Sequence, residues 1–314
     1  MATINPPGAL GAPLVPRMCL RASPDTTVAR VALGLTLYLA DPFQWLASGA
    51  GAALREFIKC APPSGPVWYT TSMLSVWRPV RPSNVASLAD QLSSPSILSL
   101  RHGFRFRLTD DLHAPSYGFE YREIDFKREA SAGVLEVTLP QDFEPAEFLP
   151  LATKLANTGP FWCGIGGYVA RWNEFEKATA FWQIFKWCRR YLGLDVQDSD
   201  RNAWEAIRGL PGSNWLTFIG RPLAEAREIK LGSLQEEPWR AEVEFRAVPN
   251  GAMLRAGTSP TLGDVNRLEF PYAYAEVSRR LAPFFKLPDY WGGFYNDEGT
   301  ARWMRRFAEP ARWT

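Results

Sequence analysis

The 314-residue sequence is poor in the side chains that bind zinc or build disulfide frameworks. It contains two histidines and four cysteines. The cysteines are Cys19, Cys60, Cys163 and Cys188. None belongs to a C-x-x-C pair or has a histidine at ligand spacing, so neither a metal site nor a cofactor is predicted. A chain of this length buries a large hydrophobic core and needs no disulfide bond or metal ion for stability. The scattered cysteines therefore predict buried thiols in a reducing compartment.

Long apolar runs and an excess of one charge are also missing. The most apolar stretch, 31–39, is too short to cross a bilayer, and the proline-broken segment 1–16 does not resemble a secretory signal peptide. A cytoplasmic protein with no membrane partner is therefore expected. The 35 Lys and Arg nearly balance the 33 Asp and Glu, for a net charge of +2. This balance does not favour nucleic acid as a partner.

The apolar pattern that is present predicts an α+β fold with antiparallel or mixed sheets and helices packed on them. Segment 31–39 is apolar or small on both faces, as in a central strand covered on both sides. Segments 104–108, 117–121 and 134–139 predict a meander, and strict alternation in 239–247 predicts a half-buried strand. Helices are expected at 50–60, 83–92, 144–157, 173–191, 200–208, 222–229, 272–281 and 300–309.

Strands and helices fall into two sets, which predicts two similar lobes. Residues 1–16 are expected to form a flexible arm, 17–157 an N-terminal α+β lobe and 158–314 a C-terminal α+β lobe. A weak seam near 157–160 separates the lobes, and a single domain is the alternative.

No segment carries a complete catalytic motif. The glycines of 164–167 do not match the G-x-G-x-x-G of nucleotide loops, and close packing in a strand accounts for them. Cys163 lies among aromatic and apolar residues, which predicts a core thiol rather than a nucleophile. His102 and His113 flank a strand of the meander and are interpreted as structural.

Carboxylates cluster in four predicted loops, and a pair of them could perform acid–base catalysis. The loops contain Asp110 and Asp111; Asp195, Asp198 and Asp200; Glu236 and Glu237; and Asp297 and Glu298. Turn formation and helix capping explain most of these residues. A carboxylate-based hydrolase or carbohydrate-active protein is therefore kept as an alternative. It requires a concave pocket in which two carboxyl groups face each other.

Aromatic side chains are abundant, with thirteen tryptophans. Helix and strand phase places most of them in the core, and an exposed pair would suit a protein-binding hot spot or a sugar platform. The apolar stripe expected on helix 173–191 comprises Ala178, Phe181, Trp182, Phe185, Cys188 and Leu192. In 300–309, arginines interleaved with aromatic residues could bind nucleic acid, but they can equally pair with the chain's own carboxylates, and a solvated helical face is the favoured interpretation.

Two neighbouring segments carry a family resemblance. Residues 190–196, Arg-Tyr-Leu-Gly-Leu-Asp-Val, end the long aromatic helix, and residues 212–219, Gly-Ser-Asn-Trp-Leu-Thr-Phe-Ile, follow them. This combination resembles the TsiV-like immunity proteins of type VI secretion in Gram-negative bacteria, loosely over 31–307. Leu192 stands where the family pattern has proline, and segment 1–16 has no counterpart.

The resemblance implies a non-enzymatic antidote with no catalytic, cofactor or metal residues. Such a protein would bind a cognate effector toxin, here a nuclease, and occlude its active site or block its assembly. A nuclease presents a basic groove, so acidic loops would complement it. The partner-binding residues expected on this basis are Asp195, Asp198, Asp200, Asp297 and Glu298, with Trp204 as an anchor. A family member that acts as an interaction protein without binding its neighbouring toxin is a further alternative.

Overall fold

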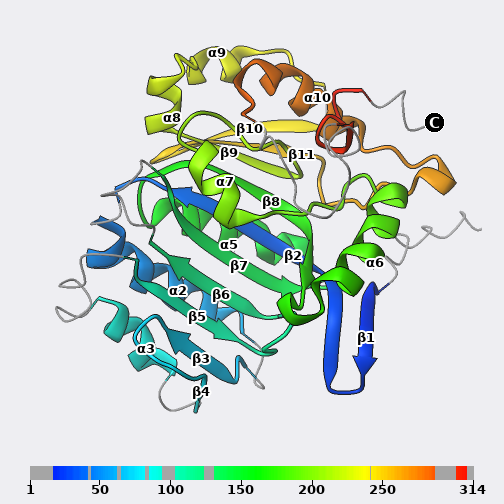
Figure 1. The fold of residues 1–314 in the computed structure, drawn as a ribbon. Coiled ribbons are helices and arrows are strands. Elements are labelled where there is room, and N and C mark those ends of the chain that lie inside the picture. The colour runs from blue at the N-terminus through cyan, green and yellow to red at the C-terminus, as the bar shows by residue number, and fades with distance from the viewer. Residues whose placement is uncertain are drawn as a thin grey trace, which may run out of the picture.

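The structure is a computed structural model that describes residues 17–41, 44–61, 65–81, 85–93, 103–123, 131–240, 242–286 and 302–309. Within these ranges, eleven strands form one sheet in the order β10-β11-β9-β8-β2-β7-β6-β5-β3-β4, and β1 pairs with β2. Neighbouring strands are antiparallel throughout. This arrangement, with helices packed on the sheet, confirms the predicted α+β class (Figure 1).

The strands are β1 (Cys19–Ser23), β2 (Thr26–Leu39), β3 (Trp68–Thr71), β4 (Arg78–Pro79), β5 (Arg105–Thr109), β6 (Gly118–Arg122), β7 (Gly133–Pro140), β8 (Phe161–Trp172), β9 (Leu216–Gly220), β10 (Val243–Val248) and β11 (Gly251–Ala256). The longer helices are α2 (Ala50–Lys59), α3 (Val85–Leu92), α5 (Pro145–Asn157), α6 (Lys177–Arg190) and α10 (Tyr272–Leu281). The short helices are α7 (Ser199–Glu205), α8 (Arg221–Ala226), α9 (Leu231–Glu236), the π-helical η1 (Trp45–Gly49) and the 3-10 turns η2 (Glu174–Glu176), η3 (Val265–Arg267) and η4 (Ala282–Phe284).

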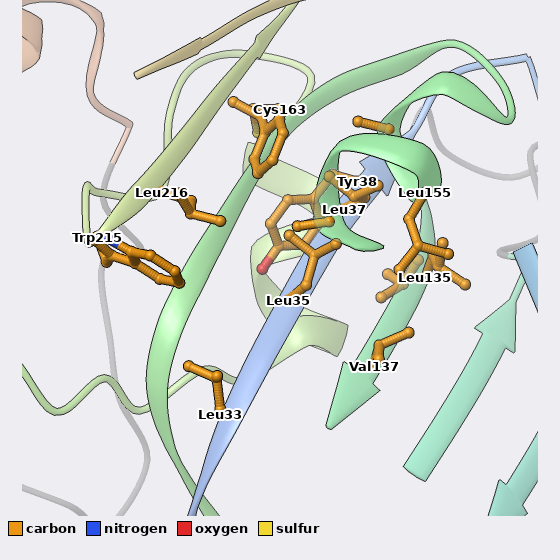
Figure 2. Close-up of a cluster of buried hydrophobic side chains, with 14 of the residues drawn as sticks. Leu33, Leu35, Leu37, Tyr38, Leu135, Val137, Leu155, Cys163, Trp215 and Leu216 are labelled. Carbon is orange, nitrogen blue, oxygen red and sulfur yellow. The ribbon is translucent and has the colours of Figure 1, made fainter. Parts of the chain in front are cut away.

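The strand β2 is the centre of the sheet, as its two apolar faces predict. It pairs with β7 from Ala32 to Leu39 and with β8 over most of its length. Figure 2 shows the buried cluster around it, in which Leu35 and Leu37 lie near side chains of β7 and α5. At Gly34 a Cβ atom would lie 2.5 Å from Cγ1 of Val169 on β8, so only glycine allows this close approach.

One face of the sheet is apolar and is covered by helices. Leu35, Val137, Phe119 and Leu108 follow one another in register across β2, β7, β6 and β5. All four are buried, and the ring of Phe57 on α2 lies 5.7 Å from that of Phe119. The burial of this row against α2 is a hydrophobic contact that holds this helix to the sheet.

The helix α5 illustrates how local sequence sets an element. Glu144 accepts a hydrogen bond from the backbone N–H of Ala146, and Pro145 occupies the first helical position, where its missing N–H leaves no bond unmade. The helix continues through Pro150 to Asn157. Its buried side rests on the sheet, with the ring of Phe148 6.0 Å from that of Trp215.

Four expectations about local structure are wrong. The strand expected from 239 begins at Val243, because the indole Nε1–H of Trp239 donates to the carbonyl of Leu234 and the Arg280 guanidinium covers its ring. Ala178 and Trp182 are exposed and do not join the buried stripe of α6, which comprises Ala180, Phe181, Ile184 and Cys188. Cys19 is exposed rather than buried. In 302–309, Trp303, Arg306 and Phe307 are buried, so this segment is not simply a solvated face.

The expected lobe boundary lies in the short connection between α5 and β8. Immediately after it, β8 pairs with β2 of the expected N-terminal lobe and with β9 of the expected C-terminal lobe. The expected arm, 1–16, lies outside the described residues.

Candidate partner-binding surface

A polar row crosses the face of the sheet opposite α2. Thr36 on β2, Glu136 on β7, Glu120 on β6 and Arg107 on β5 are successive register partners. Because side chains alternate between the two faces of a strand, these four residues share one face. The alternation of arginine with apolar residues in 104–108 is typical of a strand with one polar face, but it does not indicate which residues of β6 and β7 lie beside that face.

Glu120 is held by two arginines of the neighbouring strand. Nη2 of Arg105 lies 2.7 Å from its Oε1, and Nε of Arg107 donates to its Oε2 at 3.0 Å. Burial raises the pKa of the Glu120 carboxyl, and the Arg105 charge opposes that shift. Two charge-assisted contacts therefore compensate the placement of this carboxylate in the floor of the face.

Glu136, directly opposite Glu120, has its own partners. Arg171 on β8 donates to its Oε1 at 3.4 Å, and the Thr36 hydroxyl donates to the same oxygen at 3.3 Å. Burial acts to raise the pKa of the carboxyl, but the Arg171 and Arg122 charges outweigh it and keep that pKa below its ordinary value. The two adjacent glutamates thus have pKa values displaced in opposite directions.

A cleft of about 520 Å³ opens in front of this charged floor. Trp77 and Leu112 line one part of it, Phe175 and Lys177 at the start of α6 line another, and the α7 helix lies over the face of β7 (Figure 1). The cleft combines a charged floor with aromatic and apolar side chains at its margin. Aromatic and arginine side chains, both of which line this cleft, are enriched at surfaces that bind another protein.

The hydrolase alternative requires two carboxyl groups in a concave pocket, and Glu120 and Glu136 meet this condition. Both carboxylates are bonded to arginines, however. An acid–base pair would need one carboxyl open to a substrate. The contacts are those of a structural ion-pair network.

Asp195 is buried and connects two parts of the fold through hydrogen bonds. Its Oδ1 accepts from Nη2 of Arg306 at 3.3 Å, and its Oδ2 accepts from the side-chain amide of Gln197 at 2.7 Å. Its backbone N–H donates to the carbonyl of Tyr168 on β8. Arg306 also donates to the carbonyl of Leu192. The aspartate therefore links segment 302–309 to the sheet.

The other predicted site residues lie in or near the cleft or outside the described residues. Asp198 lines the cleft and caps α7, accepting from the backbone N–H of Arg201 at 3.1 Å. Asp200 also lines it, is largely exposed, and pairs with Arg122 of the floor. Trp204 on the same helix is half-buried. Asp297 and Glu298 lie outside the described residues.

The two segments that carry the family resemblance meet in the core. The side-chain Nδ2 of Asn214 donates to the carbonyl of Gly193 at 3.4 Å, and its Oδ1 accepts from the backbone N–H of Trp215 at 2.7 Å. A Cβ at Gly193 would lie 2.0 Å from the carbonyl oxygen of Thr261. These signature residues therefore shape the fold and do not form the surface.

The structure also locates the candidate nucleophiles and bases. Cys163 is buried, as predicted, and burial raises the pKa of its thiol. His113 is half-buried, with its backbone N–H bonded to Asp111, whereas His102 lies outside the described residues. Among the described residues, no group of three His, Cys, Asp or Glu side chains is placed to hold a metal ion. No helix in the described part of the chain is long and apolar enough to span a membrane.

Sequence reasoning missed two exposed aromatic side chains, Phe175 at the cleft and Trp182 further along α6. Phe175 in η2 is 90% exposed, and Trp182 on α6 is 64% exposed. Phe181 and Trp182 are adjacent, so on a helix of 3.6 residues per turn they point about 100° apart. Ala180, Ile184 and Cys188 lie on the same side of the helix as Phe181. The periodicity of these apolar residues therefore indicates that Trp182 points outward.

Comparisons with known proteins identify a family match for the sequence and a solved structure with a similar fold. A model of the TsiV family, described as type VI immunity for VRR-NUC, matches residues 52–307, which confirms the resemblance carried by 190–196 and 212–219. No curated protein matches the sequence. Among solved structures, the Pseudomonas aeruginosa T6SS protein PA0821 is similar with a TM-score of 0.72 and 18% identity. The match covers 91% of this chain and 85% of that chain, and at this identity it shows a shared fold.

Proposed function

The chain belongs to the TsiV family of type VI immunity proteins for VRR-NUC, and on this premise we propose that it binds a VRR-NUC effector nuclease and neutralises it. The family match carries the proposal, because it spans the cleft, α6 and α7. The chain acts in the cytoplasm, by binding alone and without turnover of its own.

The proposed mechanism is occlusion. A preformed surface on this protein covers the effector's active site or the surface through which the effector assembles. A stable complex buries roughly 1,600 Å² in total, about 800 Å² from each partner. The cleft supports this mechanism, because its floor is already cross-linked by ion pairs and loses little conformational freedom on binding.

The acidic residues of α7 contribute to the contact. Asp198 and Asp200 lie beside the cleft, where they complement the basic groove that a nuclease offers to its substrate. Trp204 follows them on the same helix as an apolar anchor. Asp195 positions this loop from inside the fold, and Asp297 and Glu298 are proposed to contact the effector as well.

The test is co-purification with the VRR-NUC effector encoded beside the gene, followed by calorimetric titration and a nuclease assay. A Kd of about 1 nM with stoichiometric loss of nuclease activity is the expected result. Co-expression without export signals should protect cells from effector produced in the cytoplasm. Absence of binding at micromolar concentrations of both proteins would overturn the proposal.

A further inference from the structure

The outward face of α6 is cationic and aromatic. Residues 177–190 include two lysines and two arginines and contain no aspartate or glutamate. The buried side of the helix holds Ala180, Phe181, Ile184 and Cys188, so Trp182 is left on the outside. Phe175, just before the helix, is more exposed still. Large aromatic side chains on the surface of a protein mark interaction sites when they occur together.

The side chains of this face, of which Phe185 is half-buried against the core, are organised by contacts with one another. The rings of Trp182 and Phe185 stack with centroids 6.2 Å apart and an interplanar angle of 16°. Nζ of Lys186 lies 5.2 Å from the Trp182 centroid, and the Arg189 guanidinium lies 5.8 Å from that of Phe185. Cations held over rings lose part of their rotamer freedom before any partner arrives, which favours binding.

The charges of Lys186 and Arg189 are available to a partner. Among the described residues, no carboxylate lies within 4 Å of either side chain, whereas Lys177 and Arg190 pair with Glu174 and Asp264. A helix face with exposed rings and two available cations is complementary to a surface that offers carboxylates around an apolar patch.

We propose that this α6 face, formed by Phe175, Trp182, Phe185, Lys186 and Arg189, is a docking surface for an acidic, partly apolar patch of the VRR-NUC effector. The inference rests on the proposed function and assigns a specific surface to it. Trp182 is the central anchor, because tryptophan and arginine dominate binding energy at protein interfaces. Lys186 and Arg189 accelerate association with the acidic partner.

Interleaved rings and cations also suit a nucleic acid, but the surroundings of the face favour a protein. Phe175 lies at the same cleft as Glu174, Asp198 and Asp200, and Asp111 lines it as well. A phosphate backbone that followed the α6 face toward this cleft would meet those carboxylates. The overall charge of +2 provides no compensating field.

The test compares Trp182→Ala and the double variant Lys186→Glu/Arg189→Glu with matched controls. Tyr272→Ala removes an aromatic ring of the same 64% exposure on α10, and Arg227→Glu reverses an exposed charge beyond the end of α8. Binding to the purified effector is followed by calorimetry and by stopped-flow association at several salt concentrations. Circular dichroism and thermal melting verify that each variant is folded.

Trp182→Ala should raise the Kd by about tenfold or more, since truncation of an interface hot spot weakens binding by at least that factor. The charge-reversed double variant should associate about tenfold more slowly and lose most of the salt dependence of association. Both controls should stay within about twofold of the wild type, the range expected outside a hot spot.

Any result other than these contradicts the inference, and the pattern of results shows which part of it is wrong. If the wild-type chain binds the effector and both α6 variants bind equally well, the proposed function stands and the docking surface is wrong. Wild-type binding to a fluorescent DNA duplex that the charge variant abolishes would assign the face to nucleic acid. A wild-type dimer in analytical ultracentrifugation that Trp182→Ala dissociates would assign it to a second copy of this chain. No effector binding by the wild type overturns the proposed function itself.

Discussion

Glu120 and Glu136 lie directly opposite each other on β6 and β7, and each carboxylate is bonded to arginine from another strand. Like charges directly opposite on a sheet destabilise it, so the pair depends on Arg105, Arg107 and Arg171. The floor of the cleft is therefore a preformed charged network whose protonation affects stability.

Stability should depend on pH through Glu136. Its pKa in the folded state is below the ordinary value, so its contribution to the free energy of unfolding is present above that ordinary value and is lost as pH falls through the folded pKa. Glu136→Gln should lower the free energy of unfolding by about 3 kcal/mol at pH 7, because Arg171 is left without its carboxylate.

Urea unfolding at pH 7 and at about pH 3.5 checks the Glu136 prediction, the lower pH lying below the ordinary glutamate pKa of about 4.3. The difference between wild type and Glu136→Gln should shrink at the lower pH, because the Glu136 carboxyl of the unfolded wild type is then mostly protonated and the folded state, with its lower pKa, begins to lose the advantage of the charged carboxylate. Glu225→Gln, at an exposed position on α8, is the control and should match the wild type at both pH values. A difference that did not change with pH would contradict this role of the Glu136 charge.

The buried Arg306 should be essential to the stability of the C-terminal segment. Its guanidinium bonds Asp195 and the Leu192 carbonyl and lies over the rings of Trp303 and Phe307. Arg306→Ala should lower the free energy of unfolding by about 3 kcal/mol, because it leaves Asp195 buried without its cation. Amide exchange in 302–309 should accelerate.

Arg305→Ala is the neighbouring control for Arg306, since Arg305 is exposed. Its free energy of unfolding, measured by chemical denaturation, should lie within about 0.5 kcal/mol of the wild-type value, as for other surface substitutions. Equal losses in the two variants would mean that burial of Arg306 does not determine the effect.

The acidic side of the cleft can be probed without disturbing α7. In Asp198→Asn/Asp200→Asn the amide introduced in place of the Asp198 carboxylate keeps an oxygen that caps the helix, while both charges are removed. Association with the effector should slow by about tenfold and become less salt-dependent. Glu225→Gln/Glu228→Gln, on and just beyond α8, should not change the rate. An unchanged rate in the Asp198/Asp200 variant would remove these residues from the proposed contact.

Thiol reactivity should follow burial. Cys19 is exposed, whereas burial raises the pKa of the Cys163 and Cys188 thiols. Native protein should react rapidly with Ellman's reagent at Cys19, and Cys19→Ser should abolish that fast phase. Cys163 and Cys188 should react only on denaturation. A fast phase that persists in Cys19→Ser and is lost in Cys163→Ser would contradict the burial of Cys163.

Much of the fold could be predicted from local pattern. Apolar residues on both faces identified 31–39 as a central strand, and helical periodicity identified 144–157 as a helix. These signals are strong because they repeat over several residues. The start of β10 could not be predicted, since the ring of Trp239 is covered by Arg280, which is distant in sequence and close only in the folded chain.

The candidate site was predicted less completely for a related reason. Asp198 and Asp200 were singled out as charged loop residues, and both line the cleft. Asp195 has the same chemical character in sequence. It is nevertheless buried in the fold, where it accepts a hydrogen bond from Arg306, 111 residues later in the chain. Exposure of a charged side chain depends on what the rest of the chain places over it.

The sequence by itself determined the fold class and the central strand, because both follow from the local periodicity of apolar residues. It also determined the family, because the segments 190–196 and 212–219 carry the family resemblance directly in their residues. The tertiary structure alone decided that Glu120 faces Glu136, that arginines of other strands balance them, and that Trp182 points into solvent. Strand register and burial are set by contacts between residues far apart in the chain, and such contacts leave no local pattern.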